Sequence, residues 1–89
     1  MEYALITGAS NGIGLELASI MAEKGHHLIL VARSKDSLLA LKNKLELQFK
    51  INVVIVVMDL SIPNQAKLLY QFCMDENLTV NFLVNNAGY

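Results

Sequence analysis

The chain has 89 residues, a length that allows one small domain and leaves no room for a second. Hydrophobic residues make up 54% of it and charged residues 17%, a composition that favours a large core and excludes intrinsic disorder. A formal net charge of -1 provides no basic surface for nucleic acid or for an anionic membrane. We therefore expect residues 1–89 to form one globular domain that binds neither.

The cysteine content and the N-terminus point to a cytoplasmic protein. Cys73 is the single cysteine, so no disulfide can form within the chain, and Glu2 is acidic where a secretory signal would carry positive charge. The longest unbroken apolar run, 53–58, is far shorter than the about 20 residues that span a bilayer. We expect a reducing compartment and no membrane span.

The first part of the chain predicts a strand, a helix and a second strand. Residues 3–6 and 28–32 are apolar runs without polar alternation, which is typical of strands buried on both faces. The segment 13–24 between them has helical period, and Gly25 follows as a stop. Its apolar residues fall on one face: Ile13, Leu17, Ile20 and Met21.

A longer helix and a third strand are predicted next. Residues 35–50 have helical period, and Ser34 or Asp36 is available as the cap at the start. Their apolar stripe consists of Leu38, Leu41, Leu45 and Phe49. The apolar run 53–58 then predicts another strand buried on both faces.

The last part predicts a third helix and a fourth strand. A helix over 62–76 would be capped by Ser61, with Pro63 in its first turn. Its buried face would align Ile62, Ala66, Leu69 and Cys73. The short apolar run 82–84 predicts the final strand.

This alternation of strands and helices predicts an α/β fold. Right-handed crossovers carry the first three strands outward in order. With the fourth strand beside the first, the result is a Rossmann-like parallel sheet with strand order 3-2-1-4, the first half of a doubly wound fold. The fourth strand would be an exposed apolar edge, and half of one sheet face would be bare. We therefore expect a homo-oligomer that forms through this edge or this face.

A glycine-rich turn follows the first predicted strand and opens the first predicted helix: Thr7-Gly8-Ala9-Ser10-Asn11-Gly12-Ile13-Gly14. Gly8 can take the tight turn, Gly12 lets the backbone approach a pyrophosphate, and Gly14 permits close packing of the helix. The helix N-terminus offers unpaired N–H groups to the anion. A tight turn alone would need one or two glycines, so three predict a nucleotide-binding turn.

The pattern Thr7-Gly8-x-x-x-Gly12-x-Gly14 resembles the cofactor fingerprint of the short-chain dehydrogenase/reductase family. Asp59-Leu60, directly after the third predicted strand, resembles the family's Asp-Val/Leu pair that contacts adenine. Asn85-Asn86-Ala87-Gly88, after the fourth, resembles its Asn-Asn-Ala-Gly motif. The resemblance covers essentially the whole chain.

The resemblance implies a set of cofactor-binding residues. Three residues of the turn would line the phosphates: Ser10, Asn11 and Ile13. Asp59 would accept a hydrogen bond from the adenine amino group, and Leu60 would pack on the base. Three residues near the end of the chain would border the ribose and brace the sheet: Asn86, Ala87 and Gly88. The alternative for Asp59 is a cap or turn residue before Ser61.

The end of the second predicted strand favours NADP(H), with NAD(H) also possible. Where NAD-type domains place an acid on the ribose 2′-hydroxyl, this sequence has Arg33 and Ser34. A guanidinium can pair bidentately with a 2′-phosphate, and Ser34 can add a hydroxyl. A solvated arginine beside a helix start is the alternative. Asn11 stands where NADP-type members often carry a second basic residue, so we expect modest selectivity.

Other reactive side chains carry no predicted chemistry. His26 and His27 have no cysteine or paired carboxylate at ligand spacing, so no metal site is predicted. Cys73 lies on the apolar face of the third predicted helix, where packing explains it.

In the family, a Tyr acts as acid and base, a Lys lowers its pKa, a Ser holds the substrate oxygen, and these residues follow later strands. Tyr89 is not that tyrosine, because no Lys follows it. The resemblance implies the NADP(H)-binding N-terminal half of a reductase, with no catalytic residue in this chain and no activity alone. The alternative is a stand-alone nucleotide-binding or oligomerising module.

Overall fold

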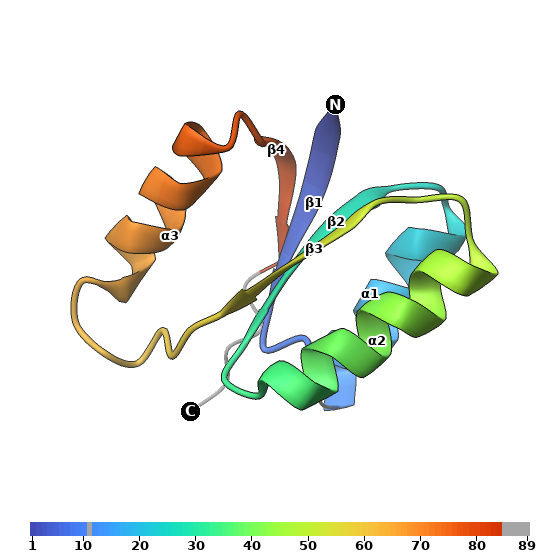
Figure 1. Ribbon diagram of the computed structural model, residues 1–89, viewed down its shortest axis with the longest axis horizontal. Helices are drawn as coiled ribbons and strands as arrows, with labels where there is room; N and C mark the ends of the chain where they lie inside the picture. Colours follow the sequence, from blue (N-terminus) through green and yellow to red (C-terminus); the bar gives the residue numbers. More distant parts are fainter. Residues whose placement is uncertain (11, 85–89) are drawn as a thin grey trace.

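The computed structural model describes residues 1–10 and 12–84. Its elements in chain order are β1 (Glu2–Thr7), α1 (Gly12–Glu23), β2 (His27–Ala32), α2 (Lys35–Gln48), β3 (Val53–Val57), α3 (Gln65–Asp75) and β4 (Thr79–Val84). The strands form one parallel sheet in the order β3-β2-β1-β4, which confirms the predicted topology. Helices α1 and α2 cover one face and α3 covers the other (Figure 1).

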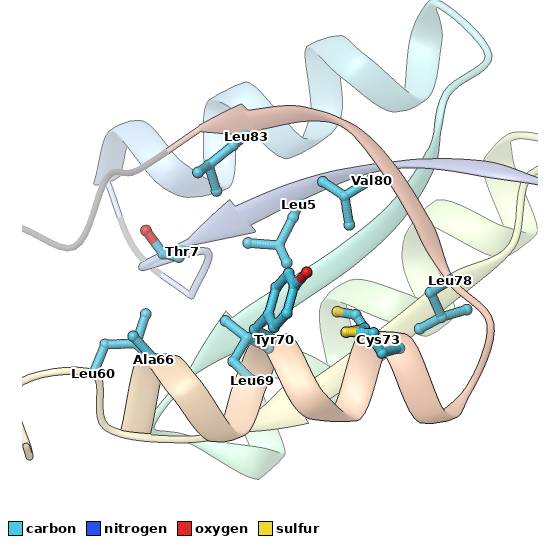
Figure 2. Close-up of a pocket in the computed structure, with 11 residues that line it drawn as sticks. Leu5, Thr7, Leu60, Ala66, Leu69, Tyr70, Cys73, Leu78, Val80 and Leu83 are labelled. Atoms are coloured by element: carbon cyan, nitrogen blue, oxygen red, sulfur yellow. The ribbon is translucent and has the colours of Figure 1, made fainter. Parts of the chain in front are cut away.

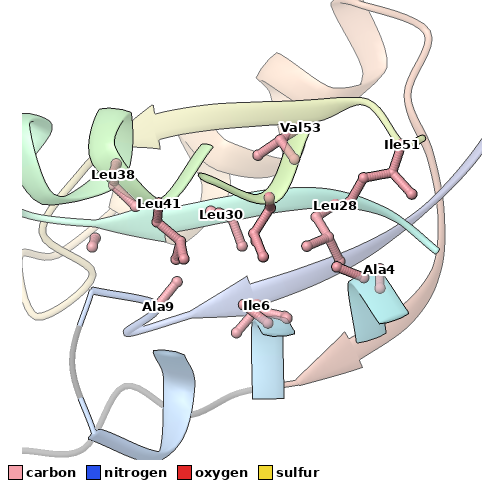
Figure 3. Close-up of a cluster of buried hydrophobic side chains, with 13 residues drawn as sticks. Ala4, Ile6, Ala9, Leu28, Leu30, Leu38, Leu41, Ile51 and Val53 are labelled. Carbon is pink, nitrogen blue, oxygen red and sulfur yellow. The ribbon is translucent and has the colours of Figure 1, made fainter. Parts of the chain in front are cut away.

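Strands β1 and β2 form the centre of the sheet and supply both halves of the core. Successive side chains of a strand point to opposite faces, so each of these strands is apolar throughout. One cluster lies under α3 and comprises Tyr3, Leu5, Ile29, Val31, Leu69 and Cys73. Leu5, Leu69 and Cys73 of this cluster are labelled in Figure 2. The other lies under α1 and α2 (Figure 3), and its largest members are Ile6, Leu28, Leu30, Leu38, Leu41 and Leu45.

Helix α1 packs on the sheet through small residues, and the predicted apolar face is wrong for Ile13 and Ile20, while Leu17 is half-buried and Met21 packs partly against the core. Its buried residues are Gly14, Ala18 and Ala22. Ile13, expected in the core, is 67% exposed, and Ile20 is exposed as well. Small side chains let a helix backbone come close to the strands beneath it, so the buried face here is set by size rather than by hydrophobicity.

Helix α2 follows the prediction closely. Ser34 is its N-cap, with the Oγ atom accepting a hydrogen bond from the backbone N–H of Ser37 at 3.2 Å. The stripe of Leu38, Leu41 and Leu45 is buried, and Phe49 packs partly against the same cluster. Capping and hydrophobic period agree, which is why this helix could be placed from sequence.

Helix α3 begins at Gln65, three residues later than predicted, and Ser61 is not its cap. The Asp59 side chain instead accepts hydrogen bonds from Ser61, which holds this segment in a turn. Asn64 at the N-cap has a left-handed φ of 73°. Ile62 therefore lies outside the helix and is 51% exposed, while Leu69 and Cys73 are buried as expected.

Strand β4 is longer than the predicted run 82–84, since it begins at Thr79, which pairs with Glu2 of β1. The apolar run did not predict this start, because Thr79 and Asn81 are polar and an exposed edge strand tolerates polar residues. Most of β4 is exposed, in agreement with the expected edge.

Glu46 fastens α2 to β3. Its Oε2 atom accepts hydrogen bonds from the backbone N–H of Val53 at 2.9 Å and from Nζ of Lys42 at 3.2 Å. The Val53 bond lowers the pKa of Glu46 most, partial burial opposes it, and Lys42 lowers it further. The carboxylate is therefore stabilised in its charged form.

We expect Glu46→Gln to lower the free energy of unfolding by about 1 kcal/mol at neutral pH, because a charge-assisted hydrogen bond is lost at a partly exposed site. A folded-state pKa below the ordinary 4.5 means that this contribution is complete above pH 4.5 and is lost as the pH falls through the lowered value. Urea unfolding at several pH values measures it. Glu23→Gln, at the exposed end of α1, is the control, and an equal loss in both variants would contradict the assignment.

Candidate functional site

The carboxyl ends of all four strands lie at one edge of the sheet, because every pairing is parallel. The glycine-rich turn follows β1, Arg33 follows β2, and Asp59 lies two residues after β3. The structure therefore brings three of the predicted segments to the same edge. This is the place where open α/β sheets bind their ligands. Four predicted site residues lie outside the described residues: Asn11, Asn86, Ala87 and Gly88.

Two glycines of the glycine-rich turn have the positive φ that a tight turn needs. Gly8 has a φ of 62° and Gly12 a φ of 51°, both in the left-handed region that glycine adopts at little cost. A Cβ atom on Gly12 would meet no atom within 4 Å, so the space above the helix start is open. Ser10 is half-buried beside it.

One backbone N–H group of the turn donates a hydrogen bond within the protein. The backbone N–H of Ala9 donates to the carbonyl oxygen of Val31 at 3.2 Å, and the Ala9 side chain is fully buried. This bond ties the turn to the last part of β2. The anion donors of the predicted cradle must therefore come from the turn after Ala9 and from the first turn of α1.

Arg33 and Ser34 stand at the exposed end of β2. The backbone N–H of Met58 donates to the carbonyl oxygen of Ala32 at 2.9 Å, which continues the sheet ladder and places the end of β2 beside the residues after β3. Ser34 caps α2 and also donates from its Oγ to the Oγ of Ser37 at 3.0 Å. Its hydroxyl is therefore engaged in capping, and the Arg33 side chain extends into solvent.

Asp59 forms a local turn with Ser61. Its Oδ1 accepts from the Ser61 hydroxyl at 2.6 Å and from the Ser61 backbone N–H at 3.0 Å. These two bonds, in that order, lower the pKa of Asp59, and the positive charge of Arg33 adds a smaller effect of the same sign. The turn role considered from the sequence is thus present. Contact with adenine stays a prediction.

Two residues of this edge were missed as site residues. Ser61 was expected to cap the helix but orients Asp59 instead, and the Asp-x-Ser spacing of an Asx turn was the available signal. Buried Thr7, at the end of β1, places its Oγ1 atom 3.4 Å from the carbonyl oxygen of Val84 at the end of β4. This long-range contact has no signal in the sequence.

Residues 1–10 and 12–84 form neither a metal-binding cluster nor a membrane-spanning helix. No group of three or more His, Cys, Asp or Glu side chains is placed to share a metal ion. No helix among these residues combines the length and hydropathy that crossing a bilayer requires.

Residues 2–89 match the family model described as short chain dehydrogenase. The chain belongs to the short-chain dehydrogenase family. Among curated relatives, the very-long-chain 3-oxoacyl-CoA reductase of Candida glabrata is 40% identical over 87 residues, covering 98% of this chain and 25% of the relative. The enzyme of the same name from Kluyveromyces lactis is 38% identical over 86 residues. This short-chain dehydrogenase chain thus spans about a quarter of the length of these relatives.

Solved structures of the family share the fold. L-sorbose reductase from Gluconobacter frateurii, complexed with NADPH and L-sorbose, is 36% identical with a TM-score of 0.89. The match covers 98% of this chain and 33% of that one. A short-chain dehydrogenase from Sphingobium yanoikuyae in complex with NADPH is 38% identical with a TM-score of 0.87, covering 99% and 34%. The four-strand sheet is therefore a part of the family's Rossmann-like fold.

Replacing Ser61 by alanine should raise the pKa of Asp59 toward its ordinary 3.8, because the largest of the interactions that favour the carboxylate is removed. Titration of the Asp59 side chain by NMR measures the change. Ser37→Ala, which removes a hydroxyl bonded to Ser34 rather than to Asp59, is the control. An Asp59 pKa unchanged by the Ser61 variant would contradict the hydrogen-bonded turn.

Proposed function

We propose that residues 1–89 are part of an NADP(H)-binding Rossmann domain of a short-chain reductase. The complete enzyme would transfer hydride between NADPH and a carbonyl or alcohol substrate. The observation that carries this proposal is the position of Arg33, at the carboxyl end of β2 and within electrostatic reach of Asp59, beside a glycine-rich turn that opens a helix. This is the sheet edge at which a dinucleotide's adenosine half is held in such folds.

Different residues of the chain would bind different parts of the cofactor. Backbone N–H groups after Ala9 would hold the diphosphate at the start of α1, with Ser10 and Ile13 beside it. The Arg33 guanidinium would pair with the 2′-phosphate. Asp59, kept ionised by Ser61, would accept from the adenine amino group, and Leu60 would pack on the base. When bound, the nicotinamide of the cofactor supplies or accepts the hydride.

The comparisons support carbonyl reduction as the reaction class. One relative is named for a 3-oxoacyl-CoA substrate and one solved structure for L-sorbose, so their substrates differ while reduction is common to both. The family resemblance places the catalytic Ser, Tyr and Lys after later strands, so we expect residues 1–89 by themselves to bind cofactor without reducing a carbonyl. A cytoplasmic location also stays a prediction.

Calorimetric titration of the chain with NADPH and with NADH tests the cofactor directly. We expect NADPH to bind more tightly, because Arg33 pairs with the phosphate that NADH lacks. The preference should be modest, since Asn11 offers no second positive charge. Equal affinities would limit the proposal to a dinucleotide of either kind, and no binding of either would refute it.

Arg33→Asp should weaken NADPH binding by about tenfold to a hundredfold, the range for losing hydrogen bonds to a charged group, and should change NADH binding far less. The same calorimetric titration measures both. Lys44→Asp makes the same change of charge on the exposed surface of α2 and serves as the control. Equal losses for the two cofactors would remove Arg33 from the 2′-phosphate site.

A second candidate function, an oligomerising module, rests on the edge strand β4. It is the outermost strand of the described sheet, and Val80, Phe82 and Leu83 are all exposed. An apolar edge of this kind readily pairs with another copy. Such a module would bind nucleotide without catalysis.

We expect the chain to self-associate at high concentration, and Phe82→Lys to shift it toward monomer, because a lysine on an edge strand opposes pairing. Light scattering over a concentration series follows the change. Phe82 also contacts His26, with ring centroids 5.2 Å apart, so circular dichroism should confirm that the variant is folded. A stable wild-type monomer at high concentration would refute this candidate.

A further inference from the structure

Strand β3 is the outermost strand on the side of the sheet opposite β4 (Figure 1). It pairs with β2 on its inner side, and within residues 1–10 and 12–84 no strand pairs with its outer side. Its sequence Val-Val-Ile-Val-Val consists of β-branched residues, with no charge and no proline. Such a segment readily pairs with a further strand, so proteins usually protect an edge of this kind.

Backbone groups of β3 alternate between the two sides of the strand. The carbonyl oxygen of Asn52 accepts from the N–H of Leu28 at 2.9 Å. The N–H of Met58 donates to the carbonyl oxygen of Ala32, also at 2.9 Å. In a parallel ladder every second residue bonds to the same neighbour, so the even-numbered residues of β3 bond to β2. The odd-numbered residues direct their N–H and C=O groups outward: Val53, Ile55 and Val57.

Two side chains of α2 bind the first of these outward residues. The N–H of Val53 donates to Oε2 of Glu46 at 2.9 Å, and its carbonyl oxygen accepts from Nζ of Lys42 at 2.6 Å. Lys42 and Glu46 lie one turn apart on α2 and bond to each other at 3.2 Å. The core holds this helix against the strand, since Leu41 and Val53 belong to one buried cluster (Figure 3). Both outward groups of Val53 are therefore already bonded.

The outward residues are arranged symmetrically about Ile55. Within residues 1–10 and 12–84, no group bonds to the outward side of Ile55 or Val57. In an antiparallel pair, two residues that lie opposite each other can exchange two backbone hydrogen bonds. Two copies of β3 related by a two-fold axis at Ile55 would pair Ile55 with its counterpart and Val53 with Val57. The strand is complementary to itself along its full length, but only when Val53 is free.

We propose that the β3 edge is a pairing surface for a second copy of this chain, and that the Lys42–Glu46 pair of α2 guards it. While the pair binds Val53, the register centred on Ile55 cannot form. A register shifted by one residue would bring Asp59 of the second copy opposite Val53, where it would meet the negative charge of Glu46. Loss of the pair frees the whole strand. This surface needs no cofactor and uses the edge of the sheet opposite β4.

Hydrogen exchange of single backbone amides tests the geometry in the unmodified chain. In dilute solution, Val53 should exchange at least about tenfold more slowly than Ile55 and Val57 after correction for intrinsic rates, because its N–H is bonded to Glu46 and theirs face water. NMR spectroscopy resolves the three amides. Equal protection of all three would overturn the proposal, since the edge would then have no guarded and no open part.

Removal of the pair tests the self-association. All variants carry Phe82→Lys, which opposes pairing through β4. Lys42→Ala with Glu46→Ala should tighten self-association by at least about tenfold in sedimentation equilibrium, because all outward groups of β3 become available. The matched control is Lys44→Ala with Glu23→Ala, which removes the same two charges from exposed positions. It should leave self-association unchanged.

Two further variants separate strand pairing from aggregation of an unfolded chain. Val57→Pro removes an outward donor and leaves the bonds to β2 in place, so adding it to the Lys42→Ala, Glu46→Ala chain should abolish the increase. Lys42→Met frees only the carbonyl oxygen of Val53 and should give a smaller increase in a chain that circular dichroism shows to be folded. Self-association unchanged by both Lys42 variants, or an increase that Val57→Pro does not reverse, would overturn the proposal.

Discussion

Parallel pairing around β2 is the constraint on which the site depends. Because β2 pairs with both β1 and β3, the residues that follow these three strands emerge at one edge, although they are far apart in sequence. The backbone bond from Ala9 to Val31 extends this order into the glycine-rich turn. Arg33 and Asp59 then lie at the ends of neighbouring strands, where the positive charge of Arg33 helps to lower the pKa of Asp59. The chemistry at the edge follows from the hydrogen-bond pattern of the sheet.

The strands of the sheet and the segments of the candidate site could be predicted because residues close together in the sequence mark each of them. The unbroken apolar run 28–32 marks a strand buried on both faces, and the glycines at 8 and 12 occupy positions whose φ angles are positive. The order of the first three strands followed from the handedness of crossovers rather than from any single residue. The family motifs then fell at the ends of the correct strands.

The errors arose where side-chain size or local hydrogen bonding overrode hydrophobic period. In α1, Ala18 and Ala22 face the core while Ile13 faces solvent. The prediction failed here because hydrophobicity does not tell how closely a helix packs on a sheet. Asp59 and Ser61 hydrogen-bond to each other and form a turn, so Ser61 does not cap α3 and the helix begins later. Contacts between distant residues, such as Thr7 with Val84, carry no sequence signal.

The small-residue face of α1 connects the core with the sheet edge that carries the candidate site. Gly14, Ala18 and Ala22 set how closely the helix rests on the sheet, and the same rigid helix begins in the glycine-rich turn. Larger side chains at these three positions would push α1 away from the sheet and would displace the backbone N–H groups of its first turn.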